Sequence, residues 1–345
     1  MKLAAITSLL ILCSILSFTG CEEKIEGCFP ADKLPPHISP LTTFGQRSEW
    51  SLDGKKVYFV DRAGGDVWVV DVETKKAKRL TKPEHRPEGH GYYRVFVLAN
   101  GDLLLGCGPI RQKLYFQVWD KDFKNPPYKI EGEELCEGPA VSRKNMKIAW
   151  TLPGQMQIYM GEIAYTDGKA KIINKKLLID NKEKVLVDGI EYDTIIETQN
   201  WRPPHENELI YSQYRKGEDL FKSELFGLDI TTGKSVNYTR SPHTYDEPEG
   251  IFPDGEYTLV ECDRHRPTRH SSTIEVYKLK LDTTSVDYER LVFFSDVEGF
   301  RSSNPVVRDD GKFFVFQASI ASSDAGVGCG LYLFDIDQYE QSKVK

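Results

Sequence analysis

The chain has 345 residues, of which 40% are hydrophobic and 11% aromatic, so it carries enough apolar surface for a globular core. Its formal net charge of −7 provides no basic footprint for a phosphate backbone, which argues against a DNA or RNA partner. The length by itself leaves open two ordinary domains or one large all-β domain of the barrel or propeller class.

The first segment of the chain predicts export. Met1 and Lys2 form a short basic start, and residues 3–18 are an apolar run too short for an ordinary membrane anchor. We therefore expect residues 1–20 to be a signal peptide. Residues 21–37 contain three prolines and few apolar side chains, which predicts a flexible tether without a core of its own.

From residue 38 onward the sequence repeats a pattern of strand, turn and strand. In the clearest copy, Asp254 and Gly255 stand between two β-rich runs, and this dipeptide indicates a hairpin with a type I′ turn. The spacing from turn to turn is roughly 45–60 residues, close to the period of a four-stranded propeller blade. The other copies of the turn lie at residues 53–54, 100–101, 144–145, 205–207 and 310–311.

The strands predicted around these turns carry apolar residues on both faces. Val57 and Phe59 alternate with Tyr58 and Val60, as expected for a strand packed between two neighbouring blades. In chain order, we expect strands at residues 46–50, 56–61, 67–72, 77–81; 92–98, 103–107, 114–119, 127–130; 138–142, 147–152, 157–165, 171–179; 198–202, 209–214, 225–230, 236–239; 246–251, 257–263, 273–281, 290–294; and 304–307, 313–318, 331–336.

The sixth copy is one strand short, because only the polar tail 338–345 follows its third strand. Residues 38–43 resemble the fourth strand of the first copy. Pro40 suits an outermost strand, whose outward N–H groups have no ladder partner. We therefore predict an all-β, six-bladed β-propeller over residues 38–345, with four-stranded blades and an N-terminal strand that completes the last blade.

Two stretches resemble known families. Residues 50–59, 67–71 and 78–81 resemble the repeat of TolB-type, WD40-like bacterial β-propellers, and the likeness covers nearly all of the chain after the tether. Residues 17–21 read Ser-Phe-Thr-Gly-Cys, which resembles the bacterial lipobox. That likeness implies that Cys21 is lipidated and holds the protein on a membrane of the bacterial envelope, on the periplasmic or surface side of the outer membrane. An ordinary secretory signal that is cut nearby is the alternative.

The loops between second and third strands, and those between blades, fall on one face of the predicted propeller. On this loop face, residues 262–270 combine two histidines and three arginines opposite the acidic run 246–249. Arginine pairs with carboxylates and histidine titrates near neutrality, so the pattern suits an acidic glycan. The alternative is a set of Arg–Glu bridges that hold loops together. The candidate ligand-binding residues, expected to converge at the central depression, are His90, His243, Glu247, Glu249, Arg264, His265, Arg266 and Arg301.

Other chemistry has little support in the sequence. Residues 84–90 mix histidine and glutamate without a His-x-His or His-x-x-x-His pair, so we expect no metal and no cofactor, with a divalent metal as the alternative. No nucleophile elbow, P-loop or Cys-x-x-Cys motif is present, and the catalytic residues are unknown. Most cysteines after Cys21 are expected to be buried free thiols, although Cys107 and Cys136 could pair.

Three functions fit these observations. The first is a lipid-anchored binding module for a glycan or protein partner on the loop face, which needs no unseen catalytic group. The second is a uronate lyase resembling oligogalacturonide lyases, in which a histidine removes a proton while arginine or metal neutralises the developing charge. That family has seven blades and a metal cluster of histidine and glutamine without a match here. The third is a structural component of an envelope complex, as the TolB resemblance implies.

Overall fold

The computed structural model describes residues 34–217, 222–266 and 273–344. The predicted signal peptide, Cys21 and most of the predicted tether lie outside these residues. Strands account for 54% of the described residues and helices for 5%, so the prediction of an all-β fold is confirmed. Within the described ranges, no helix is both long and apolar enough to cross a membrane.

The described strands form five antiparallel sheets, four of which have four or five strands. The first sheet contains β2 (Gln46–Trp50), β3 (Lys56–Val60), β4 (Val67–Asp71) and β5 (Ala77–Arg79). The next of these contains β13 (Lys184–Val187), β14 (Ile190–Trp201), β15 (Glu208–Arg215), β16 (Ser223–Asp229) and β17 (Ser235–Asn237). A third contains β18 (Asp246–Ile251), β19 (Tyr257–Cys262), β20 (Glu275–Lys280) and β21 (Tyr288–Arg290). The fourth contains β22 (Phe300–Val307), β23 (Phe313–Ile320), β24 (Leu331–Asp335) and β1 (Ile38–Pro40).

The remaining sheet has seven strands because one long strand serves two units. The first part of β9 (Tyr128–Val141) pairs with β8, and its last part pairs with β10. Two separate strands were expected here, and that expectation is wrong. Gly132 and Glu137 have positive φ, of 85° and 62°, yet the strand continues through both positions. The sheet also contains β6 (Gly91–Val97), β7 (Leu103–Ile110), β8 (Lys113–Trp119), β10 (Lys147–Thr151), β11 (Gln157–Thr166) and β12 (Lys169–Asp180).

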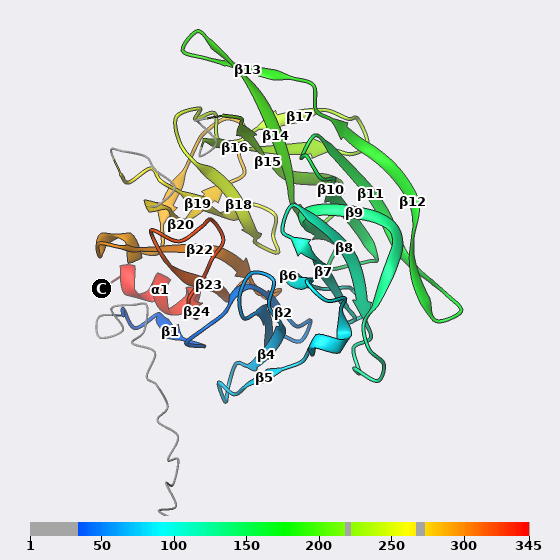
Figure 1. The fold of residues 1–345 in the computed structure, drawn as a ribbon. Helices are drawn as coiled ribbons and strands as arrows, with labels where there is room; N and C mark the ends of the chain where they lie inside the picture. The colour runs from blue at the N-terminus through cyan, green and yellow to red at the C-terminus, as the bar shows by residue number, and fades with distance from the viewer. Residues whose placement is uncertain (1–33, 218–221, 267–272, 345) are drawn as a thin grey trace, which may run out of the picture.

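Six strands, namely β2, β6, β9, β14, β18 and β22, lie innermost. Each contacts the next in chain order, and β22 contacts β2. Figure 1 shows the sheets following one another around this centre from blue through green and yellow to red. The apolar clusters lie between neighbouring sheets: Trp50 and Phe59 of one sheet, for example, pack with Val315 of another. The centre itself is therefore available to polar side chains.

Strand β1 pairs antiparallel with β24, as expected for the segment 38–43. Ile38 lies opposite Phe334, and Pro40 opposite Tyr332. The Ile38 side chain is buried in the same cluster as Phe314 and Phe334. An N-terminal segment thus forms the outermost strand of a sheet whose other strands come from the C-terminal end of the chain (Figure 1).

The turns between first and second strands differ from the predicted type I′ geometry. At residues 53–54 only Gly54 has a positive φ, of 65°, and its N–H donates to the carbonyl of Ser51 at 2.9 Å. The Asp53 carboxylate accepts the N–H of Lys55 at 3.0 Å. The aspartate therefore closes the turn with its side chain and leaves the left-handed position to glycine. The turns at Asp254 and Asp310 repeat this contact, at 2.8 and 3.0 Å.

Two described elements were not predicted. The hairpin of β13 and the first part of β14 projects away from the other sheets in Figure 1, and Leu186 and Ile190 near its tip are 73% and 56% exposed. The tail after β24, predicted to lack a strand, forms the short helix α1 (Ile336–Lys343). The Asp335 side chain caps this helix by accepting the N–H of Gln338 at 2.9 Å.

Candidate functional site

Each of the six innermost strands changes register against the strand that follows it in the chain, which is the mark of a β-bulge. At three of these bulges the chain places Arg47, Glu137 and Asn304 in the left-handed region, with φ of 54°, 62° and 46°. This conformation is costly for residues other than glycine and concentrates at functional sites. The register shifts lie between residues 46 and 49, 92 and 94, 136 and 140, 198 and 200, 248 and 250, and 303 and 306.

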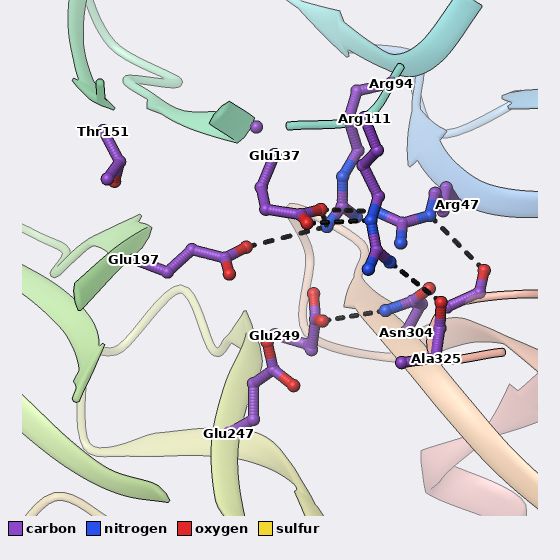
Figure 2. Close-up of polar contacts among 12 residues, drawn as sticks. Arg47, Arg94, Arg111, Glu137, Thr151, Glu197, Glu247, Glu249, Asn304 and Ala325 are labelled. Atoms are coloured by element: carbon purple, nitrogen blue, oxygen red, sulfur yellow. Dashed lines mark hydrogen bonds and ion pairs between the residues drawn. The ribbon is translucent and has the colours of Figure 1, made fainter. Parts of the chain in front are cut away.

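The bulged strands and the loops beside them direct charged side chains toward one another at the centre of the molecule (Figure 2). We call this group the axial cluster. It contains five glutamates, four arginines and one asparagine. Its members are Arg47, Arg94, Arg111, Glu137, Glu197, Glu247, Glu249, Glu261, Arg301 and Asn304.

Two cavities meet at the axial cluster. The smaller, of about 140 Å³, is lined by Arg111, Gln155 and Ala325 from loops between second and third strands, so it opens on the loop face. The larger, of about 350 Å³, is lined by Arg143 and Asp309 from the first-to-second-strand turns on the opposite face. Five residues line both cavities and therefore stand at their junction: Arg47, Arg94, Glu197, Glu249 and Asn304.

Arginines form one side of the junction. Arg47, Arg94 and Arg111 surround the Glu137 carboxylate, with N–O distances of 3.4, 3.7 and 2.8 Å. Burial and the neighbouring Arg94 charge lower the pKa of Arg47 to about 10. The Arg47 guanidinium is thus still charged at neutral pH.

Arg94 is the least satisfied of these side chains. It makes a second ion pair with Glu197 at 3.8 Å, and its side chain is 13% exposed. Its guanidinium donates no hydrogen bond to another described residue, and its buried Nε has no partner. A buried guanidinium normally has acceptors for its five donors, so Arg94 offers several of them to whatever fills the cavity.

Carboxylates form the opposite side, where Glu247, Glu249 and Glu261 place oxygens within 4.8 Å of one another. The hydroxyls of Tyr214 and Tyr245 donate to Glu247. No basic nitrogen of a described residue lies within 4.0 Å of the three carboxylates. Burial, together with the neighbouring Glu247 charge, raises the pKa of Glu249 to about 7 and raises the pKa of Glu261 well above its usual range.

Three of the eight residues predicted to bind ligand belong to the axial cluster. Glu247 and Glu249 extend from β18, and Arg301 extends from β22. The Arg301 guanidinium donates to the carbonyls of Ser323 and Asp324 at 2.9 and 3.0 Å, which fixes it beside the loop-face cavity.

The other five do not reach the centre, so the predicted convergence of all eight is wrong. His90 Nδ1 lies 3.2 Å from the Tyr115 hydroxyl in a shallow hollow of about 870 Å³ that shares no lining residue with the axial cavities. His243 is half exposed and lies 3.5 Å from Asp188. Each histidine lies in a segment that leads from the outermost strand of one sheet to the innermost strand of the next, and neither lines an axial cavity.

Arg264, His265 and Arg266 take structural positions in the next loop. Arg264 lies 3.4 Å from the buried Asp246 carboxylate, and Arg266 donates to the carbonyl of Ser295. His265 Nε2 is 2.7 Å from the Ser295 hydroxyl. Burial and nearby arginines lower the pKa of His265 to about 4, so this ring is neutral at physiological pH. The structure therefore favours the alternative interpretation, in which these side chains hold loops together.

Sequence reasoning missed most of the axial cluster because its members lie inside strands. Arg47, Arg94, Glu197 and Asn304 stand near the middle of β2, β6, β14 and β22. A charged or amide residue at the same place in successive copies of an apolar repeat was the available signal. Aligning the copies on their inner strands, and not on their turns, would have exposed it.

Three cysteines are buried free thiols, as expected for most of them: Cys107, Cys136 and Cys262. The suggested pairing of Cys107 with Cys136 is therefore wrong. Cys107 instead donates to the Tyr115 hydroxyl at 3.3 Å. Cys329 is disulfide-bonded, which the sequence did not predict.

No family model matches the chain, and no curated protein matches it. A solved structure described as a TolB from Agrobacterium tumefaciens is 17% identical, with a TM-score of 0.55 over 79% of this chain and 85% of that one. A gluconolactonase from Xanthomonas campestris is 13% identical, with a TM-score of 0.53 over 86% and 88%. An oligogalacturonate lyase from Vibrio parahaemolyticus is 12% identical, with a TM-score of 0.50 over 86% and 93%. At these identities the likeness shows the fold, which is a TolB-like β-propeller.

Proposed function

We propose that this protein is a lipid-anchored β-propeller of the bacterial envelope that acts as a binding module. Its axial cavity takes in an acidic group of a glycan or protein partner from the loop face. The observation that carries the proposal is Arg94, a largely buried guanidinium that lines the junction of both cavities and donates no hydrogen bond to a described residue.

An acidic partner suits the arginine side of the cavity. A carboxylate placed between Arg94 and Arg47 would accept charge-assisted hydrogen bonds from donors that are already ordered. The cost of orienting these side chains is met in the folded protein by the ion pairs to Glu137. Preorganised donors favour binding because little conformational freedom remains to be lost.

The lyase alternative requires a proton acceptor beside the arginines. None of the described histidines lines either axial cavity. Burial and neighbouring carboxylates raise the pKa of Tyr214 and Tyr245 well above the usual range, which makes them poor bases at neutral pH. Binding needs only the arginines and no proton acceptor, and it is therefore the function that we propose.

The proposal includes a closed ring of six blades. The cyclic contacts among the six innermost strands support it, as does the pairing of β1 with β24. In this arrangement β9 supplies the outer strand of the second blade and the inner strand of the third. Lipidation at Cys21 would then place the ring beside the membrane, joined to it by the tether. The sequence of residues 17–21 supports this anchor.

The test is a binding measurement with paired acidic and neutral probes. Oligogalacturonate and an acidic peptide, each compared with its methyl-esterified form, would be titrated into full-length protein in detergent. Arg94→Gln should weaken binding of the acidic probe roughly tenfold or more, since a charge-assisted hydrogen bond contributes about 1.5–3 kcal/mol. The matched control is Arg62→Gln, which removes an exposed arginine outside the cavities and should leave affinity unchanged. Equal binding of acidic and neutral probes by the wild type would refute the proposal.

A further inference from the structure

The acidic side of the axial cavity brings three carboxylates close together. Glu247, Glu249 and Glu261 converge from β18 and β19, yet no described basic side chain forms an ion pair with them. Glu249 and Glu261 each accept hydrogen bonds from Asn304 at one oxygen only, at 2.8 and 2.7–3.1 Å. Their second oxygens have no hydrogen-bond donor among the described residues. Three carboxylates this close normally share a positive partner.

A second observation comes from the amide of Asn304. The residue is 4% exposed and lines both axial cavities, and its Nδ2 reaches Glu249 and Glu261. Its Oδ1, however, is buried without any hydrogen-bond partner. A buried amide oxygen without a donor is unusual, and this oxygen becomes a neutral ligand for a cation when the amide turns over. Rotation of the amide exchanges Oδ1 with Nδ2 and brings the oxygen to the carboxylates.

From these contacts we propose that Glu247, Glu249, Glu261 and Asn304 form a binding site for one Ca²⁺ ion. Every ligand is an oxygen, which is the donor set of hard cations. Ca²⁺ binds oxygen at about 2.3–2.6 Å, so two ligands on opposite sides of one ion are about 4.6–5.2 Å apart. The carboxylate oxygens already lie within that span, at 4.8 Å or less. Mg²⁺ needs shorter distances and an octahedral arrangement, so it fits this group less well.

The proposed cation ligands adjoin the arginines that carry the proposed function, since Glu249 and Asn304 line the same junction, but they come from different strands. Arg47 and Arg94 extend from β2 and β6, respectively, whereas the cation ligands come from β18, β19 and β22. A cation can therefore bind without any acidic partner, and loss of one activity leaves the other measurable. In Figure 2 the arginines gather around Glu137, while Glu249 and Glu247 lie below them.

The experiment uses CaCl₂ alone, added to full-length, chelator-treated protein in detergent. We expect Tm to rise with calcium concentration, because a ligand that binds only the folded state stabilises it. Calorimetric titration should give about one ion per chain, in line with a single cluster of ligands. MgCl₂ at the same concentration should raise Tm less. Absence of a calcium-dependent Tm shift, or an equal shift with magnesium, would overturn the proposal.

Two variants locate the ion. Glu249→Gln and Glu261→Gln should each weaken calcium binding roughly tenfold or more, a loss equal to about one charged ligand. Glu73→Gln removes the same charge at an exposed position and should bind calcium as the wild type does. In chelator, both cavity variants should be at least as stable as the wild type, because glutamine removes repulsion and still accepts from Asn304. Wild-type calcium binding in both variants, or a marked loss of stability in chelator, would show that these carboxylates are structural.

Discussion

Glu275 allows a quantitative test of how burial changes the pKa of a carboxyl group in this protein. The residue begins β20 and is completely buried. The Ser302 hydroxyl donates to one of its oxygens at 2.5 Å, and the Ser295 N–H donates to the other. Arg290 is the charged group that faces it, at 3.8 Å. Burial outweighs these contacts and raises the pKa of Glu275 from 4.5 to about 7.

The sign of the resulting pH dependence follows from the direction of that change. Because the folded-state pKa of Glu275 is the higher one, the folded protein binds this proton more tightly than the unfolded chain does. The contribution to stability is complete below pH 4.5 and is lost as the pH rises through 7. One pKa unit corresponds to about 1.4 kcal/mol, so this side chain costs about 3 kcal/mol of unfolding free energy by about pH 8.

Glu275→Gln removes the titration with little change of shape. The amide oxygen can accept from the Ser295 N–H, and the amide nitrogen can donate to the Ser302 hydroxyl. We expect the variant to be about 2–3 kcal/mol more stable than the wild type at about pH 8 and nearly equal at about pH 5. Urea unfolding across this range measures the difference, with Glu73→Gln as the exposed control. A variant with the same pH slope as the wild type would show that the reasoning is wrong.

Three further predictions concern the N-terminal segment. Ile38→Ala should destabilise the protein by about 2–4 kcal/mol because it opens a cavity under β1, whereas Ile110→Ala, at a 53% exposed position, should be nearly neutral in the same unfolding assay. Deleting residues 1–45 should cause marked destabilisation or aggregation, since the edge of β24 loses its partner; a deletion variant that unfolds like the full chain would contradict ring closure. Cys21→Ala should leave the protein in the aqueous phase of a detergent partition, and quantitative recovery in detergent would exclude the lipid anchor.

The regular part of the fold was predictable because turn chemistry and apolar alternation agree. Asp-Gly turns fixed the hairpins of the first, fifth and sixth copies, and all three strand pairs appear in the structure. Prediction failed where a local signal was missing. In β9 the local signals misled instead: neither Gly132 nor the pair Gly138-Pro139 ends the strand, so two expected strands are one. The β13 hairpin was missed because its strand of four residues lacks a long apolar run.

The site was harder to predict than the fold because its geometry depends on bulges. A regular strand alternates its side chains between two faces, and a prediction from sequence assigns each residue to a face on that basis. A bulge inserts one residue and redirects the next ones, so Arg47 or Asn304 faces the centre although simple alternation does not require it. Glu247 and Glu249 were predicted from their charge to belong to a cluster of loop residues. The structure does not form that cluster.

The axial cluster costs stability, and this cost is the best argument that it has a purpose. Replacing a buried ion-pair network by apolar residues is often neutral or stabilising, because desolvation offsets much of the attraction between the charges. Three of its ten members also adopt left-handed backbone conformations, each costing on the order of 1–3 kcal/mol. The apolar clusters between the sheets already supply a core without it. Backbone strain, desolvated charges and guanidinium donors without acceptors therefore coincide at the junction of the two cavities. We infer that the protein keeps these destabilising features because a ligand binds there.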